Sequence, residues 1–159
     1  MPVMGTDLRL AIKSTSSNNT EQIAELIGNN LIGGEIVVLA SDLGGGKTVF
    51  AKGLARGAGS QDQVSSPTFT ISKVYKCESF DLHHFDFYRL NDPGIIALEL
   101  KEVIGDTQNV IVIEWADIIK NILPKHRMEV IIENEGGDKR GIILNYPAKI
   151  EYLVEAIKP

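Results

Sequence analysis

The chain has 159 residues and a formal net charge of −5, with 43% hydrophobic and 23% charged residues, which predicts a single globular domain over residues 1–159. The single cysteine, Cys77, excludes an internal disulfide. Because no run of about 18 apolar residues marks a membrane span and residues 1–13 lack the apolar segment of a secretory signal, we expect a cytoplasmic protein without membrane contact. Its 16 Lys and Arg residues are dispersed, which disfavours tight nucleic-acid binding by this chain alone.

The chain begins with a strand signal and a helix signal. Residues 8–12 alternate apolar with polar or small side chains, which predicts a half-buried strand. In the helix that follows, Ile23, Leu26 and Ile27 share one apolar face, and Gly33-Gly34 is expected to end the helix.

The later elements mix helices with hairpins. The expected strands cover residues 35–40, 71–75, 80–88, 109–115, 127–133 and 140–145, and the expected helices cover 47–58, 95–103, 117–122 and 148–157. The third and fourth of all the predicted strands would pair as one hairpin, and the last two as another. Helices alternating with strands predict an α/β fold of the P-loop NTPase type, with a mixed β-sheet flanked by helices and with β-hairpins.

Residues 41–48, Ser-Asp-Leu-Gly-Gly-Gly-Lys-Thr, form a candidate phosphate-binding loop between a buried strand and a helix. Backbone N–H groups of such a turn and the helix N-terminus attract phosphate. Lys47 would then reach the β- and γ-phosphates, and the Thr48 hydroxyl would ligate Mg²⁺. A flexible glycine loop with a chance Lys-Thr is the alternative. Ser41 replaces the usual first glycine, and a serine with positive φ would be strained there.

Two acids end predicted strands on the side of this loop, and they could complete a site for Mg²⁺ and an attacking water. Asp86 and Glu114 have this position, although a surface acid or a helix cap is the alternative for each. A buried Glu114 would need a cation or a donor beside it. His83 and His84 should point to opposite faces of their strand, one toward the core and one toward solvent. Trp115 could stack near a nucleotide or fill the core.

With these pieces in order, the chain resembles the TsaE family (also called YjeE), small bacterial P-loop ATPases needed to make N6-threonylcarbamoyladenosine in tRNA. The resemblance rests on residues 41–48, Ser66-Pro67-Thr68-Phe69-Thr70, His84-Phe85-Asp86-Phe87-Tyr88-Arg89-Leu90, Asp92-Pro93 and Ile113-Glu114-Trp115. Ser41 and Ala116 depart from the family pattern, which usually has Gly and Pro at these positions.

The resemblance implies the ligands and the residues that bind them. ATP or ADP would be bound by Asp42, Leu43, Gly44, Gly45, Gly46, Lys47, Thr48 and Val49, with Thr68 and Trp115 also at the nucleotide. Mg²⁺ would be held by Thr48 and Glu114. Lys47, Asp86 and Glu114 would be catalytic. Ser66 and Thr68 resemble a nucleotide-sensing switch, and the hairpin end at Lys139 or Arg140 could approach the nucleotide.

The resemblance also implies partners, the related proteins TsaB and TsaD, with tRNA contacted through them. Hydrolysis would be slow without partners, because no arginine is obviously placed as a finger in cis. A small-molecule kinase is one alternative, but the five dispersed arginines argue against the cationic lid that a kinase needs. A nucleotide-binding scaffold without hydrolysis is another, and it should lack Asp86 and Glu114.

Overall fold

A mixed seven-stranded sheet forms the centre of the molecule, as the sequence predicts. The computed structural model describes residues 7–42, 44–67, 71–90, 92 and 94–158. The strand order is β1-β7-β6-β2-β5-β4-β3. The strands are β1 (Asp7–Ser14), β2 (Ile36–Ala40), β3 (Ser72–Lys76), β4 (Asp81–Asp86), β5 (Asn109–Glu114), β6 (Met128–Asn134) and β7 (Arg140–Pro147).

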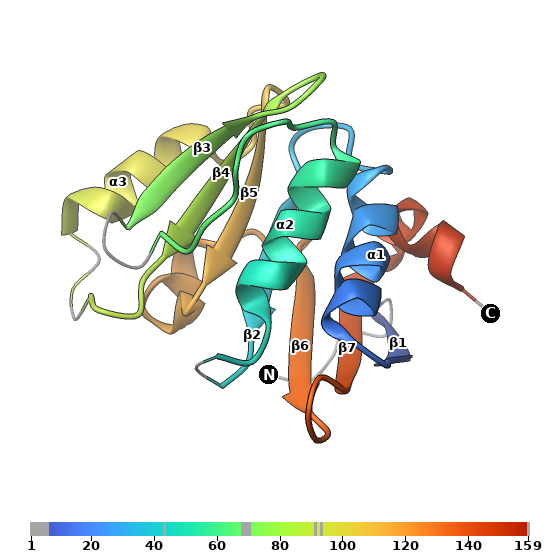
Figure 1. Ribbon diagram of the computed structural model, residues 1–159. Coiled ribbons are helices and arrows are strands. Elements are labelled where there is room, and N and C mark those ends of the chain that lie inside the picture. Colours follow the sequence, from blue (N-terminus) through green and yellow to red (C-terminus); the bar gives the residue numbers. More distant parts are fainter. Residues whose placement is uncertain (1–6, 43, 68–70, 91, 93, 159) are drawn as a thin grey trace.

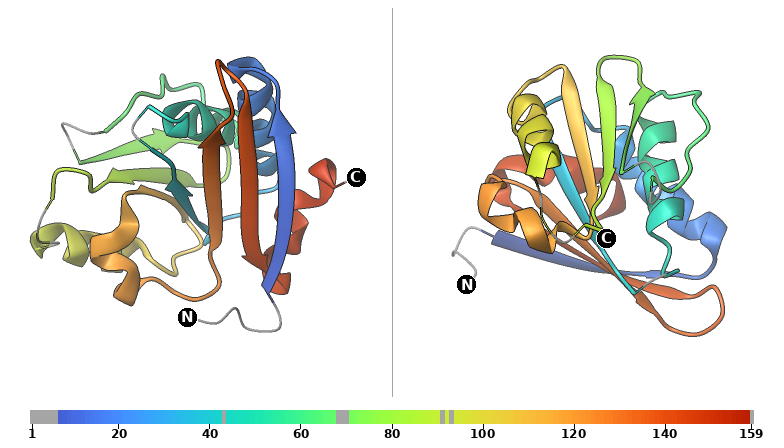
Figure 2. Two further views of the ribbon diagram at one scale, coloured as in Figure 1. Left: turned by 90° about the horizontal axis from the view of Figure 1, so that it is seen from below. Right: turned by 90° about the vertical axis from the view of Figure 1, so that its left-hand side faces the viewer.

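Helices cover both faces of this sheet (Figures 1 and 2). They are α1 (Ser17–Gly28), α2 (Lys47–Gly57) and α3 (Gly94–Val103), with two 3-10 helices, η1 (Ala116–Ile122) and η2 (Ala148–Ile157). One apolar core lies between the sheet and α1, α2 and η2, and a second lies between the sheet and α3 and η1. In the part of the chain that the structure describes, no helix is long and apolar enough to span a membrane.

The middle of the sheet is parallel, and this sets the position of the candidate site. Strand β2 pairs in parallel with β5 and β6, and β5 pairs in parallel with β4. Register places Glu114 opposite both Leu39 and Asp86. The carboxyl ends of β2, β5 and β4 therefore meet at one edge of the sheet, where ligands bind in open α/β sheets. The antiparallel pairs, β3 with β4 and β7 with β6 and β1, lie toward the two sides.

Helix α1 differs from the sequence prediction in its end and in its buried face. It ends at Gly28 instead of Gly33-Gly34. The Glu35 carboxylate accepts hydrogen bonds from the backbone N–H groups of Ile32 (2.9 Å) and Gly33 (2.8 Å), which holds this segment outside the helix. The side chain of Leu26 was expected in the core but is 38% exposed, and Ala24 is buried in its place, beside the two isoleucines of the predicted face.

Helices α1 and α2 approach each other through glycines. A Cβ atom on Gly53 would lie 2.3 Å from the Glu21 carbonyl oxygen, and one on Gly57 would lie 2.2 Å from that of Glu25. A Cβ on Gly28, at the end of α1, would lie 2.3 Å from the carbonyl oxygen of Leu54 on α2. Backbone therefore meets backbone along this contact, and α2, which carries the phosphate-loop candidate at its N-terminus, is fixed against α1.

We predict that Gly53→Ala lowers the free energy of unfolding by about 2 kcal/mol, because the added methyl group collides with backbone that cannot rotate away. Helix propensity alone would raise it by about 1 kcal/mol. The melting temperature should fall by about 4–8 °C for a chain of this size. Lys52→Ala is the matched control, since Lys52 is half-exposed on the same helix and its ion pair with Glu21 lies at the surface. An unchanged or raised melting temperature for Gly53→Ala would contradict the close contact.

Candidate functional site

In the loop between β2 and α2, the left-handed backbone conformations lie at glycines and not at Ser41. Gly44 (φ 77°) and Gly46 (φ 112°) have left-handed backbone conformations. Among the described residues other than glycine, only Ile71 and Trp115 have positive φ, so Ser41 does not have the backbone conformation in which a serine would be strained. Gly45 is required for a different reason, because a Cβ there would lie 2.5 Å from the Ser41 hydroxyl oxygen.

The Lys47 amine lies inside this loop. Lys47 is buried, and its Nζ donates to the Ser41 carbonyl (3.3 Å), the Ser41 hydroxyl (3.0 Å) and the Asp42 carbonyl (3.3 Å). The same amine lies 4.7 Å from the centre of the Trp115 ring, a cation–π contact. Burial lowers the pKa of Lys47, and the negative charges of Glu114, Asp86 and Asp42 oppose that shift. The amine therefore lies where burial and the neighbouring carboxylates act on its charge in opposite directions.

Two buried carboxylates face this part of the loop. Asp86 and Glu114 are each 3% exposed and are register partners at the ends of β4 and β5. Asp86 Oδ1 accepts a hydrogen bond from the Tyr88 backbone N–H (2.9 Å). Both acids therefore lie inside the protein beside the phosphate-loop candidate, which does not fit the alternative that either is a surface acid.

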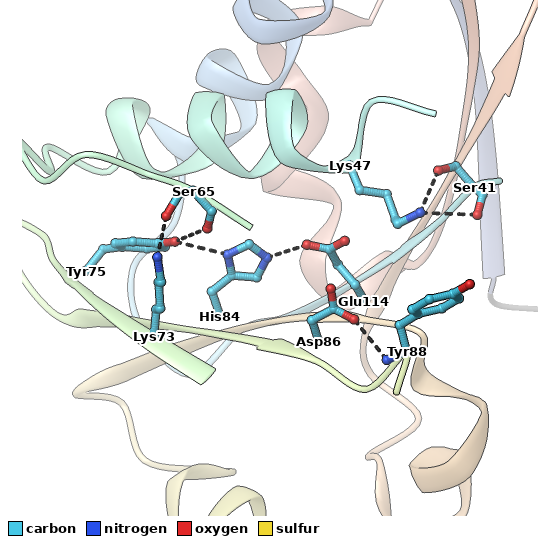
Figure 3. Close-up of polar contacts among 9 residues, drawn as sticks. All are labelled: Ser41, Lys47, Ser65, Lys73, Tyr75, His84, Asp86, Tyr88 and Glu114. Atoms are coloured by element: carbon cyan, nitrogen blue, oxygen red, sulfur yellow. Dashed lines mark hydrogen bonds and ion pairs between the residues drawn. The ribbon is translucent and has the colours of Figure 1, made fainter. Parts of the chain in front are cut away.

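The donor that a buried Glu114 requires is His84, a partner that the sequence did not identify. His84 is fully buried, and its Nε2 lies 2.6 Å from Glu114 Oε2. Figure 3 shows this ring between Glu114 and the Tyr75 hydroxyl, which lies 3.3 Å from His84 Nδ1 and donates to the Ser65 carbonyl at 2.9 Å. The available signal was the two-residue period of a strand, which places His84 on the same face as Asp86.

His83 points to the opposite face of β4, as predicted, but it is not solvent-facing. It is half-buried, and its Nε2 lies 2.9 Å from the Asn109 side-chain oxygen. Neither histidine of the pair therefore points freely into water.

Trp115 both borders the site and packs on the core, so the two uses proposed for it are compatible. Its backbone is left-handed (φ 59°), and its ring lies 4.8 Å from that of Tyr88. The indole also packs against the core on the α3 side of the sheet. Tyr88, 46% exposed, is a further site residue that sequence reasoning missed, although it too follows the two-residue period from Asp86.

These groups line a cavity of about 250 Å³ at the carboxyl ends of the central strands. Its lining consists of Gly44, Gly45, Gly46, Lys47, Thr48, Val49, Ser66, Asp86, Tyr88, Glu114 and Trp115. Asp42 contributes its carbonyl to Lys47 without lining the cavity. The predicted residues Leu43 and Thr68 lie outside the described residues. The structure therefore gathers most of the predicted site around one cavity.

The donor set of this cavity fits an anion bound together with a hard cation. The Lys47 amine and the N-terminus of α2 suit phosphate oxygens. The Thr48 hydroxyl and the Glu114 carboxylate are oxygen ligands of the kind that Mg²⁺ prefers. In the described ranges, no group of three or more His, Cys, Asp or Glu residues could hold a metal by itself. Mg²⁺ is usually bound by one or two carboxylates together with substrate phosphates.

Two further residues, Arg140 and Cys77, lie outside the lining of the cavity. Arg140, on β7, donates from Nε to the Gly45 carbonyl oxygen (3.0 Å), which places this hairpin end beside the phosphate-loop candidate. Cys77 is half-buried, and burial raises the pKa of its thiol to about 11. A thiol that remains protonated at neutral pH is a poor nucleophile.

Comparison with known proteins gives concordant results. Residues 14–142 match the family model described as "Threonylcarbamoyl adenosine biosynthesis protein TsaE". The chain is 38% identical over 134 residues to the tRNA threonylcarbamoyladenosine biosynthesis protein TsaE of Bacillus subtilis, covering 84% of each chain. It is 36% identical over 135 residues to the protein of that name from Rickettsia conorii, covering 82% of this chain and 76% of the relative. The crystal structure of Bacillus subtilis YdiB matches with a TM-score of 0.78, 32% identity and 96% coverage of both chains.

Proposed function

The chain belongs to the TsaE family of threonylcarbamoyl adenosine biosynthesis proteins, and we propose that it binds ATP with Mg²⁺ and hydrolyses it in support of this tRNA modification. The observation that carries the proposal is the grouping of one buried amine, Lys47, with two buried carboxylates, Asp86 and Glu114, around a glycine loop. A phosphate-binding loop alone would be common to many NTPases. The two acids add the groups that hydrolysis requires.

ATP or ADP would lie with its phosphates against residues 42–49, where backbone N–H groups and the N-terminus of α2 favour negative charge. Lys47 would exchange its hydrogen bonds to Ser41 and Asp42, which are 3.0–3.3 Å long, for stronger charge-assisted ones to phosphate. Thr68 and Trp115 would complete the nucleotide contacts. The Trp115 ring lies 4.7 Å from the Lys47 amine, the group that would meet a phosphate, which supports a place for the indole beside the nucleotide.

Thr48 and Glu114 would hold Mg²⁺, which when bound neutralises charge on the phosphates. Asp86 would orient the attacking water and accept its proton, since it ends the strand next to that of Glu114 and is equally buried. This division of work gives three catalytic residues, Lys47, Asp86 and Glu114.

Hydrolysis by this chain alone would be slow. Arg140, the arginine that contacts the loop, is held by the Gly45 carbonyl and by carbonyls of its own hairpin, at Gly137 and Lys139. An arginine bound in this way does not act as a finger on the transferred phosphoryl group, which elsewhere is worth about 10³–10⁵ in rate. A partner would therefore have to complete the site.

TsaB and TsaD are the proposed partners, with tRNA reached through them, for a single cytoplasmic ATPase domain spanning residues 1–159. The net charge of −5 supports this arrangement, because a chain that held tRNA by itself would need a basic surface. The family's place in tRNA modification supports it as well.

We predict that Lys47→Ala abolishes nucleotide binding. Trp115 is the only tryptophan, so its fluorescence should respond to ADP or ATP with Mg²⁺ in the natural protein and not in the variant. Calorimetry gives the affinity independently of the indole. The control is Lys52→Ala, which removes an exposed amine from the same helix and should leave binding unchanged. Normal calorimetric affinity in Lys47→Ala would refute the assignment of the loop.

We predict that Asp86→Asn retains ATP binding but loses hydrolysis by at least about 100-fold, the usual range for a removed acid–base group. Asparagine keeps an oxygen to accept the Tyr88 N–H, so the local turn is preserved. Phosphate release and ATP affinity are the two measurements. Asp81→Asn, at the partly exposed start of the same strand, is the control. Unchanged turnover would remove Asp86 from the mechanism.

We predict that the chain co-purifies with TsaB and TsaD in the presence of nucleotide and that its ATPase rate then rises at least about 10-fold, because they would supply the missing stabilisation of phosphoryl charge. Pull-down and phosphate release measure the two effects. If no association occurs with any nucleotide, the partner proposal fails. Transfer of phosphate to a small molecule would favour a kinase, and binding without turnover under all conditions would favour a scaffold.

A further inference from the structure

We propose that His84 is a positioning residue that holds the Glu114 carboxylate in the orientation needed to ligate Mg²⁺, and that Tyr75 holds the His84 ring in turn. The inference deepens the proposed function and rests on the role of Glu114 there. It assigns work to two buried polar residues that lie beyond the cavity and that a nucleotide would not touch.

His84 contacts the Glu114 carboxylate directly. His84 Nε2 lies 2.6 Å from Glu114 Oε2. A carboxylate that ligates a metal ion is ionised and only accepts hydrogen bonds, so in the metal-binding state the ring nitrogen is the donor. Among the described residues, His84 is the hydrogen-bond partner of this side chain, and it binds one oxygen of the two. Glu114 is also one of the residues that line the cavity. A carboxylate fixed at one oxygen presents the second in a defined direction.

The His84 ring is contacted on its other side by Tyr75. Its Nδ1 lies 3.3 Å from the Tyr75 hydroxyl, and the two rings are 5.9 Å apart with their planes inclined at 50°. Tyr75 is 3% exposed, and its hydroxyl donates its one proton to the Ser65 carbonyl at 2.9 Å, so toward His84 Nδ1 the Tyr75 oxygen can only accept. Burial raises the pKa of Tyr75, so this hydroxyl keeps its proton at neutral pH. The series Ser65, Tyr75, His84 and Glu114 runs without interruption in Figure 3.

Burying His84 beside Glu114 has an energetic cost that needs an explanation. A buried histidine and a buried carboxylate cost solvation free energy, and apolar residues of similar size often stabilise a protein as well or better. His84 lies on the same face of β4 as the core residue Leu82, where an apolar side chain would fit the surroundings. Outer hydrogen-bond partners of metal ligands orient those ligands, and their loss typically costs about 10–100-fold in metal affinity. A polar residue at this position is thus explained by its effect on Glu114.

The test compares two substitutions that differ in one donor. His84→Leu removes the N–H group, whereas His84→Gln can present an amide N–H at a reach similar to that of Nε2. ADP affinity is measured by calorimetry with the metal chelated, and Mg²⁺ is then titrated into the saturated ADP complex with Trp115 fluorescence as the readout. Unfolding of each variant is followed in parallel.

We expect His84→Leu to bind metal-free ADP within about 2-fold of the natural protein and to need about 10–100-fold more Mg²⁺. His84→Gln should recover most of this loss. Tyr75→Phe, which keeps the aromatic ring and deletes only the outer hydroxyl, should need several-fold more Mg²⁺, and it serves as the second variant if His84→Leu does not fold.

An unchanged Mg²⁺ requirement in His84→Leu, or in Tyr75→Phe if His84→Leu does not fold, would overturn the inference. So would a parallel loss of metal-free and metal-bound affinity, which indicates a purely structural role. Failure of the proposed function looks different, because the natural protein would then show no Mg²⁺-dependent ADP binding. Glu114→Gln separates the two kinds of failure. If Glu114→Gln abolishes the Mg²⁺ response while His84→Leu retains it, the proposed function stands and only the inference fails.

Discussion

Two buried carboxylates on neighbouring strands are the constraint on which the site depends. The parallel register of β4 and β5 places Asp86 beside Glu114, both almost fully removed from water. Like charges so close and so buried are unfavourable unless cations and donors surround them. Lys47 supplies the cation, His84 a donor to one acid and the Tyr88 backbone a donor to the other. Bound Mg²⁺ would add positive charge where the protein has concentrated negative charge.

The elements that dominate the fold could be predicted because their signals are local. The alternating pattern of residues 8–12, the apolar runs of β2 and β5 and the glycines of the loop each specify their own conformation, and the structure contains them at nearly the expected positions. The positions of Asp86 and Glu114 followed from one further rule, that carboxyl ends of parallel strands share an edge. The loop pattern itself indicated a phosphate-bearing ligand, and the family resemblance added the expectation of ATP hydrolysis and of the partner proteins.

What the sequence did not predict depends on contacts between distant residues. His84 and Glu114 are 30 positions apart, and nothing local pairs them. Helix α1 stops early because Glu35, seven residues beyond its end, takes up backbone N–H groups that a longer helix would use. From the loop pattern alone, Ser41 could have had the positive φ that the usual glycine allows, and strain with it. The structure places the left-handed conformations on Gly44 and Gly46 and leaves the Ser41 hydroxyl to bind Lys47.

The glycine contact between α1 and α2 has a consequence for how this chain can change over time. A core of leucines and valines tolerates exchange, because one side chain can grow while its neighbour shrinks. At Gly53 and Gly57 the nearest opposing atoms are the carbonyl oxygens of Glu21 and Glu25. Main-chain atoms are the same in every residue, so no substitution can make them smaller. The close contact between the two helix backbones therefore fixes the position of the loop that precedes α2. Sequence drift in the surrounding core can proceed without moving it.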